Sequence, residues 1–297
     1  MHKDSSKSLK IESYIVPELS EKSRIQDLAS GMFVHTPTKS GLKKAIRKGL
    51  VEINGVQVSS GTFLLGGETI NLFQRQDSST KPKIELKLEV VFEDEFLALV
   101  NKPPGITVSG IKKWTLENAL SSNLKISNQT DALIRPEPIH RLDHATSGIL
   151  LVGKTASSVI FLNKLFENRE IQKTYYAVVI GNIKSTGSIT KLVDGKTAAT
   201  DYTVIHQEVS KRFNMLSLVK LTPSSGRKHQ LRKHLASQGN PILGDPLYGT
   251  QDKLLKGNGL YLHAYSLNFK HPFTKEIIHL SIPPTKKFLR LFSSIKF

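Results

Sequence analysis

The sequence predicts an α+β fold in which a mixed, mostly antiparallel sheet is preceded by a small α/β unit. Strand-like and helix-like patterns follow one another without the regular alternation that builds a parallel βαβ sheet. Residues 50–58 and 266–282 each alternate apolar and polar side chains around a turn, which is typical of a hairpin. The 297 residues are enough for one large domain and one small domain.

The charge of the chain predicts an anionic partner. The formal net charge is +17, and two runs contain no acid: residues 39–48 carry five Lys or Arg, and residues 211–234 carry seven. A basic run is often only a solvated face, but two acid-free runs in a basic chain favour a binding surface for nucleic acid over an anionic membrane surface. The absence of cysteine excludes disulfides and thiolate metal sites.

The first 75 residues divide into a polar tail and a compact unit. Residues 1–11 are expected to be disordered, and residues 12–75 to fold. A helix is predicted over 40–49, with Ser40 as the N-cap, an apolar stripe at Leu42, Ala45 and Ile46, and Gly49 at its end. The hairpin at 50–58 and a turn with a strand at 65–72 follow, whereas residues 32–35 are either a packing segment or an insertion.

A linker is predicted at residues 76–86 and a larger domain at 87–297. Two strands around an acidic turn are expected within 90–100, a buried strand at 149–153 after a tight polar turn at 146–148, and a helix at 156–168. A central strand at 175–181, a short helix at 229–237 and the hairpin at 266–282 complete the domain.

The segment from His140 to Gly148 is the first candidate for chemistry. It places Asp143 close to the fixed cation Arg141 and directly before the buried strand. A carboxylate held at the end of a rigid strand suits catalysis. The ordinary alternative is an aspartate that caps a turn and pairs with an arginine.

Five motifs in order, between residues of roughly 90 and 275, resemble those of the RluA-type pseudouridine synthases. They are Val100–Gly105, His140–Gly148, Lys173–Ala177, Gly226–His234 and Pro241–Gly249. The resemblance implies a pseudouridine synthase domain with a central RNA-binding cleft, working without a metal or a cofactor. The segment between Gly181 and Thr197 is shorter than is usual for that family, which implies a trimmed loop on that side.

The resemblance assigns the catalytic roles to Asp143, Tyr175 and Arg232. Asp143 is the nucleophile, with attack on the anomeric carbon of the sugar or on the uracil ring both open. Arg232 is the cation that keeps this carboxylate ionised, with phosphate contact as the alternative. Tyr175 packs on the target base and is a candidate for moving the carbon-5 proton. Tyr175 could instead be a core side chain, with Tyr176 facing the site.

RNA binding is expected at two groups of side chains. In the larger domain these are Arg141, Arg227, Lys228 and His229; Arg141 would fill the site of the extruded uridine or clamp the backbone, unless it forms a structural salt bridge. The order of elements in residues 12–75 resembles the small RNA-binding domain named after ribosomal protein S-four, whose basic helix docks on RNA. On that resemblance the contacts there are Lys43, Lys44, Arg47 and Lys48. A plain accessory unit is the alternative.

The sequence therefore predicts an RNA uridine isomerase, with ribosomal RNA favoured over tRNA as substrate. A non-catalytic RNA-binding or ribosome-assembly protein on the same fold is the first alternative, and a metal-dependent nuclease the second. His140 and His144 are four residues apart but lack the glutamate of a zinc helix, and His229 and His234 lie among cations, so no metal is expected. The protein is expected in the cytoplasm, because no signal core and no apolar run of about 20 residues is present. A monomer is also expected.

Overall fold

The structure of the protein is a computed structural model that describes residues 8–36, 38–75, 83–250, 255, 257 and 259–292. The chain divides into two compact units that meet between Pro82 and Lys83. This boundary lies within the expected linker of 76–86, of which residues 76–82 lie outside the described part. The linker does not extend to residue 86, because Ile84 is buried in the core of the second unit and its N–H donates to the Asn118 carbonyl.

The first unit contains a four-stranded sheet in the order β1-β6-β3-β4. These strands are β1 (Ser8–Ile15), β6 (Thr69–Arg75), β3 (Val51–Ile53) and β4 (Val56–Gln57). A second ladder joins β2 (Ser23–Arg24) to β5 (Phe63–Leu64). The expected disordered tail of 1–11 is wrong for residues 8–11, because β6 supplies hydrogen-bond partners to this polar stretch; residues 1–7 lie outside the described part.

Helix α1 (Ile25–Leu28) is a single turn, and α2 (Lys39–Arg47) is the predicted basic helix. The N-cap is Thr38 and not Ser40: the Thr38 side chain accepts the N–H of Gly41 at 3.0 Å, and Ser40 lies inside the helix. Leu42, Ala45 and Ile46 are buried as predicted. The hairpin is also confirmed, since its turn residues Asn54 and Gly55 both have positive φ angles, of 47° and 83°.

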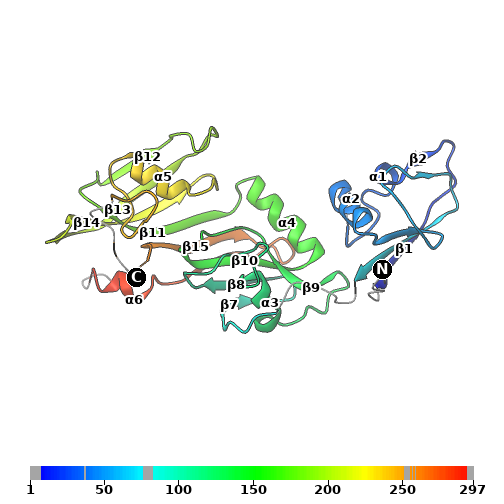
Figure 1. The fold of residues 1–297 in the computed structure, drawn as a ribbon, viewed down its shortest axis with the longest axis horizontal. Helices are drawn as coiled ribbons and strands as arrows, with labels where there is room; N and C mark the ends of the chain where they lie inside the picture. Colours follow the sequence, from blue (N-terminus) through cyan, green and yellow to red (C-terminus); the bar gives the residue numbers. More distant parts are fainter. Residues whose placement is uncertain are drawn as a thin grey trace. The chain divides into compact units, whose positions relative to one another are not determined.

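The second unit is built on a ten-stranded sheet in the order β12-β13-β14-β11-β15-β10-β8-β7, with β16 beside β15 and β9 beside β10 (Figure 1). Among the described strands only β10 and β15 pair in parallel, so the predicted mixed, mostly antiparallel α+β fold is confirmed. The strands are β7 (Glu89–Glu93), β8 (Leu97–Lys102), β9 (Ala132–Pro138), β10 (Ser147–Thr155), β11 (Gln172–Ile180), β12 (Thr186–Ile189), β13 (Thr200–Ser210), β14 (Asn214–Pro223), β15 (Leu262–Lys270) and β16 (Ile277–Ser281).

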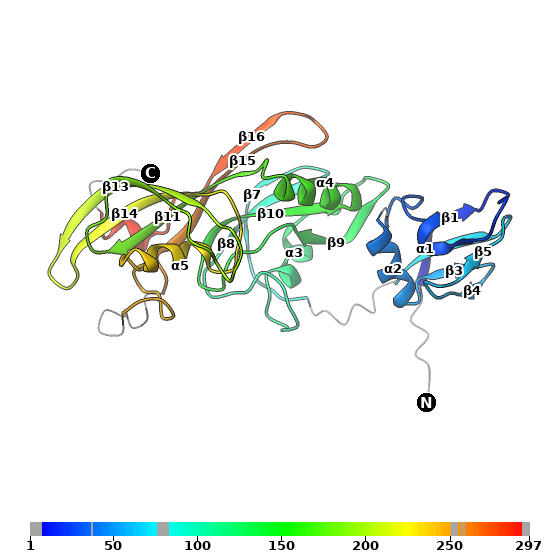
Figure 2. The same ribbon diagram turned by 90° about the horizontal axis from the view of Figure 1, so that it is seen from above.

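The helices described in this unit are α3 (Glu117–Asn123), α4 (Ala156–Glu167), α5 (Gln230–Ser237) and α6 (Lys286–Leu289). Helix α4 lies beside β10, and α5 lies at the end of the sheet formed by β12, β13 and β14 (Figures 1 and 2). Two apolar clusters result, one around β8 and β10 and one around β11 and β14. Tyr175 packs against both clusters, which places it at the junction between the two halves of the sheet.

Strand β10 begins two residues earlier than predicted. Ser147 and Gly148 are already part of the strand, and the tight turn is Asp143–Thr146, closed by a hydrogen bond from the Thr146 N–H to the Asp143 carbonyl. Gly148 has a φ of 114°, and a Cβ there would lie 2.1 Å from the Ala264 carbonyl oxygen. The glycine therefore allows β15 to approach β10 at the point where the Asp143 loop ends.

No helix in the described part of the chain is both long enough and apolar enough to span a lipid bilayer.

Candidate active site

One pocket of the second unit brings together side chains from four separate segments of the chain. Its lining includes Arg141, Asp143, Tyr175, Arg227, His229 and Arg232. The three residues predicted to be catalytic, Asp143, Tyr175 and Arg232, thus lie around a single hollow although 89 positions of sequence separate Asp143 from Arg232. The pocket lies at the junction between the two apolar clusters, where Tyr175 belongs to both.

The loop of Asp143 is held by the buried end of β8. The Lys102 ammonium is fully enclosed and donates to the carbonyls of Pro103 at 2.9 Å, His144 at 3.3 Å and Thr146 at 2.7 Å. The Gly105 N–H also donates to the His144 carbonyl. Burial lowers the pKa of Lys102 to about 8, although the nearby charge of Asp143 acts in the opposite direction. Lys102 therefore fixes the backbone on the C-terminal side of Asp143.

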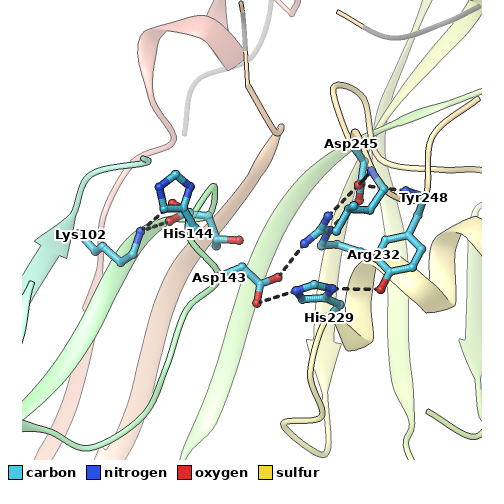
Figure 3. Close-up of polar contacts among 9 residues, drawn as sticks. Lys102, Asp143, His144, His229, Arg232, Asp245 and Tyr248 are labelled. Atoms are coloured by element: carbon cyan, nitrogen blue, oxygen red, sulfur yellow. Dashed lines mark hydrogen bonds and ion pairs between the residues drawn. The ribbon is translucent and has the colours of Figure 1, made fainter. Parts of the chain in front are cut away.

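The Asp143 carboxylate faces two nitrogen atoms from the other half of the sheet. Arg232 Nη1 donates to Oδ2 at 3.3 Å, and His229 Nε2 lies 3.7 Å from Oδ1 (Figure 3). The Asp143 side chain retains 27% of its exposed surface, whereas the Arg232 side chain retains 5%. Asp143 is thus the part of this cluster that the pocket leaves open to a ligand.

Arg232 is held more firmly from its other side. Its Nε and Nη2 atoms donate to the two oxygens of Asp245 at 2.7 and 2.8 Å, in the two-pronged geometry that suits a guanidinium and a carboxylate. The Arg232 guanidinium also lies over the Tyr248 ring, 5.1 Å from its centroid. Burial acts to lower the pKa of Arg232, but its bonds to Asp245 and then its contact with Asp143 raise this pKa overall, so the side chain stays charged.

His229 is the left-handed N-cap of α5, with a φ of 55°. Such a backbone conformation is uncommon for a residue other than glycine and is found at functional sites. Its Nδ1 atom shares a hydrogen bond of 3.0 Å with the Tyr248 hydroxyl. Burial lowers the pKa of His229, and the charge of Asp143 opposes that shift. The neutral ring of His229 therefore links Tyr248 to Asp143.

The two neighbouring tyrosines of β11 have different surroundings. Tyr175 lines the pocket, whereas Tyr176 packs edge-to-face on Tyr265 with ring centroids 4.8 Å apart. The β11–β15 register shifts by one residue here: Thr174 lies opposite Ser266 and Tyr175 opposite Ala264, so the pairing passes over Tyr265 of β15. Burial, and then the charge of Asp143, raises the pKa of Tyr175, so its hydroxyl stays protonated.

The basic side chains predicted to contact RNA are exposed around this pocket. Arg141 and Arg227 line its rim and Lys228 is exposed next to them, whereas His229 lies deeper, against Asp143. Arg141 makes no ion pair within the described residues, so the structural salt bridge considered for it is not observed. Arg227 donates from Nε to the Thr197 carbonyl at 3.3 Å.

In the first unit, α2 turns its apolar stripe into the core and leaves its cations outside. Lys44, Arg47 and Lys48 are exposed and Lys43 is half-buried. Lys43 and Arg47 border a shallow hollow completed by Val58, Ser59 and Ser60.

His140 and His234, two of the histidines considered as metal ligands, have other partners. His140 Nε2 accepts the Leu151 N–H at 3.0 Å, and burial lowers the pKa of His140 to about 3. His234 is bonded to the Thr200 hydroxyl and the Lys191 carbonyl. Among the residues that the structure describes, no three His, Asp or Glu side chains gather in a way that could hold a metal ion.

Sequence reasoning assigned no role to Lys102, Asp245 or Tyr248, although all three lie in the motifs that carry the resemblance. Lys102 lies in the segment 100–105, and Asp245 and Tyr248 lie in the segment 241–249. Their effect is indirect: they hold the loop of Asp143, the guanidinium of Arg232 and the ring of His229. The sequence motifs place these three residues in the same family resemblance, but they do not show which side chain each residue contacts.

Comparison with known proteins agrees with this geometry. Residues 97–237 match the family model described as RNA pseudouridylate synthase. The chain is 30% identical to ribosomal large subunit pseudouridine synthase C of Vibrio vulnificus, covering 87% of this chain and 88% of that protein. It is also 30% identical to ribosomal large subunit pseudouridine synthase D of Xanthomonas campestris pv. campestris, covering 95% and 92% respectively.

The fold resembles that of human RNA pseudouridylate synthase domain containing 1, with a TM-score of 0.58 and 23% identity over 72% of this chain and 90% of that one. This likeness supports the fold of the catalytic unit. The matches to the two relatives at 30% identity extend over most of both proteins, and the family model spans the segment that contains Asp143, Tyr175 and Arg232. The chain therefore belongs to the RluA family of RNA pseudouridine synthases, enzymes that isomerise uridine in RNA to pseudouridine.

Proposed function

We propose that the protein isomerises specific uridines of large-subunit ribosomal RNA, with Asp143 as the nucleophile. The observation that carries the catalytic part is the position of Asp143: it is the open carboxylate of a pocket whose other walls are Tyr175 and the Arg232 guanidinium. The substrate part rests on the two relatives named above, both ribosomal large subunit synthases, and on the formal charge of +17.

The reaction exchanges one bond of the sugar for another. The anomeric carbon loses its bond to ring nitrogen 1 and gains a bond to ring carbon 5, which releases its proton, while nitrogen 1 takes up a proton. The Asp143 carboxylate can add to the anomeric carbon as the uracil leaves, or it can add to the uracil ring; in either case it is released when the new carbon–carbon bond has formed. Both routes use the carboxylate form of Asp143, and Arg232 Nη1 donates a hydrogen bond to its Oδ2.

Tyr175 is the wall on which the extruded uracil would pack. Its raised pKa keeps the hydroxyl protonated, so the phenol can donate a hydrogen bond but is a poor base. We therefore assign to Tyr175 the stacking of the base, and any transfer of the carbon-5 proton through its hydroxyl would require that hydroxyl to pass on its own proton. Stacking on an aromatic ring offsets part of the few kcal/mol that unstacking a nucleotide costs.

RNA would be held by the exposed cations of both units. In the catalytic unit these are Arg141, Arg227 and Lys228 at the pocket rim. On this proposal, Arg141 occupies the site that the uridine leaves. In the first unit they are the cations of α2, on a unit that we interpret as an S-four-like RNA-binding domain. Its support is the basic helix with a buried apolar stripe followed by the Asn54–Gly55 hairpin.

Pseudouridine mapping in cellular RNA tests this proposal. RNA from a strain that lacks the protein should have lost pseudouridine at one or a few positions of large-subunit ribosomal RNA. The wild-type chain should restore these positions, and Asp143→Asn, produced at the same level, should not. Loss of pseudouridine only in tRNA would contradict the ribosomal assignment, and restoration by Asp143→Asn would contradict the catalytic one.

A further inference from the structure

The turn formed by residues 244–249 holds both of the nitrogen groups that face Asp143, yet among the described residues no hydrogen bond or ion pair joins this turn to the Asp143 carboxylate. Asp245 binds Arg232, and Tyr248 binds His229 (Figure 3). We propose that Asp245 and Tyr248 are positioning residues for the isomerisation, which set the place and direction of the Arg232 guanidinium and the His229 ring beside Asp143. This inference rests on the proposed role of Asp143 as the nucleophile.

The geometry of the turn is fixed by close backbone packing. Gly244 has a φ of 75°, and a Cβ at this position would lie 2.1 Å from the Gly259 carbonyl oxygen, so only glycine fits. Asp245 Oδ1 accepts the N–H groups of Leu247 at 2.9 Å and Tyr248 at 3.1 Å. The same carboxylate therefore closes the turn and places Tyr248 relative to Arg232.

Asp245 divides the donors of Arg232 between two carboxylates. It takes Nε and Nη2 at 2.7 and 2.8 Å, which leaves Nη1 for Asp143 at 3.3 Å. Without Asp245, the guanidinium would be free to turn both prongs toward Asp143. A carboxylate held by two short charged bonds makes a poorer nucleophile, because its lone pairs are engaged and its charge is neutralised. Asp245 thus lets Arg232 orient Asp143 without binding it tightly.

Tyr248 has the corresponding effect on His229. If the Tyr248 hydroxyl donates to Nδ1, the neutral imidazole carries its proton on Nε2, the atom that lies 3.7 Å from Asp143 Oδ1. The negative charge of Asp143 favours this same tautomer. The Tyr248 ring also lies under the Arg232 guanidinium, so the Tyr248 side chain contacts both Arg232 and His229.

The test measures single-turnover release of tritium from uridine labelled at carbon 5, in total RNA from a strain that lacks the protein. Asp245→Asn keeps an oxygen for the N–H groups of Leu247 and Tyr248 but loses the second acceptor for Arg232. We expect its rate constant to fall by about 10- to 100-fold, the scale of a displacement of about 1 Å in a reacting group, with little change in RNA affinity. Glu93→Gln is the matched control, since Glu93 forms an ion pair of 2.7 Å with the buried Lys154, and neither residue lines the pocket. This variant should keep the wild-type rate.

A double-mutant cycle separates positioning from mere folding. If Asp245 acts through Arg232, adding Asp245→Asn to Arg232→Met should change the rate by less than about threefold. Tyr248→Phe, which keeps the ring, should lower the rate by about 3- to 10-fold, the effect of one hydrogen bond. This loss should disappear in the His229→Asn background, where asparagine can adopt the left-handed backbone conformation.

A spectroscopic readout is the NMR signal of the Arg232 Nε–H. It should stay protected from exchange in Asp143→Asn and lose that protection in Asp245→Asn.

The outcomes distinguish this inference from the proposed function. A wild-type rate in Asp245→Asn, or losses that multiply fully in the double variant, would overturn the role of Asp245, and a wild-type rate in Tyr248→Phe would overturn that of Tyr248. If Asp245→Asn does not fold, two other measurements still test the proposal. They are the double-mutant cycle of Tyr248→Phe with His229→Asn and the exchange protection of the Arg232 Nε–H in Asp143→Asn. Full activity of Asp143→Asn would instead refute the proposed nucleophile.

Discussion

Asp143 and Asp245 bind the same guanidinium from opposite sides, and they differ in every other respect. Asp245 is fully enclosed, receives two charged bonds of 2.7 and 2.8 Å, and accepts two backbone N–H groups. Asp143 keeps 27% of its surface and receives one long bond of 3.3 Å. Two aspartates on one arginine can thus serve opposite purposes: the enclosed one holds the arginine in place, and the open one remains available to react.

The largest effect should come from removing the shared partner. Arg232→Met leaves Asp245 enclosed without a counter-charge and Asp143 without its cation, so we expect a loss of roughly 3–5 kcal/mol in the free energy of unfolding and a severe loss of turnover. Arg227→Met is the comparison, because Arg227 is exposed and, among the described residues, its side chain donates to the Thr197 carbonyl rather than to a carboxylate. Denaturant unfolding and tritium release measure the two effects. If Arg227→Met proves the more damaging change, the arginine has been assigned wrongly.

The comparison is sharpened by placing the same substitution at each carboxylate. Asp245→Asn should lower the free energy of unfolding by about 2–3 kcal/mol, because a buried charged pair is broken. Asp143→Asn should change it by less than about 1 kcal/mol, because that side chain is partly solvated. Urea unfolding of both variants measures the difference. Equal losses would mean that the two carboxylates share the structural role.

A pH series on Lys102 tests how the loop of Asp143 is held. Burial lowers the folded-state pKa of Lys102 from 10.5 to about 8, so between these values the unfolded chain binds more protons than the folded one. Raising the pH from 8 to 10 should therefore stabilise wild type relative to Lys102→Met, by on the order of 2 kcal/mol. Unfolding at a series of pH values measures it. A difference that is constant with pH would show that burial does not lower the pKa of Lys102, which would then stay charged in the folded chain over this range.

The smallest expected effect concerns the first unit and leaves the chemistry intact. Replacing Lys44, Arg47 and Lys48 by Gln should lower the slope of log affinity against log salt by about 2–3, at 0.7–0.9 per lost phosphate contact. Single-turnover rates at saturating RNA should stay at the wild-type level. Replacing the exposed Lys87, Lys184 and Lys270 instead controls for net charge. An equal change of slope in both triple variants would leave α2 as part of a plain accessory unit.

Much of the fold could be predicted because local patterns and tertiary contacts agree. The apolar stripe of α2, the Asn54–Gly55 turn and the β15–β16 hairpin each combine a local signal with the burial observed. The errors lie where tertiary contact overrides the local signal. Residues 8–11 are polar but form part of β1 because β6 pairs with them, and Gly148 resembles a turn residue but lies in β10 because β15 requires a close approach there.

The candidate site divides in the same way. Asp143, Tyr175 and Arg232 could be named because their motifs resemble those of a known family, and the structure brings all three to one pocket. The alternation of a strand sends Tyr175 and Tyr176 to opposite faces, but it could not decide which face carries the pocket, because that depends on how β11 pairs with β14 and β15. The partners Asp245 and Tyr248 could not be assigned either. Asp245 lies 13 residues from Arg232 and Tyr248 lies 19 residues from His229, and the sequence does not show how the chain folds back between them.

Tritium release by Asp143→Asn, compared with Asp245→Asn on the same RNA, tests the central claim most directly. The account predicts no detectable isomerisation by Asp143→Asn, since an amide of the same shape cannot act as the nucleophile, while Asp245→Asn is slowed but active. Both variants should bind RNA as tightly as wild type. More than about a tenth of the wild-type rate in Asp143→Asn would contradict the account, because the open carboxylate would then not be the group that reacts.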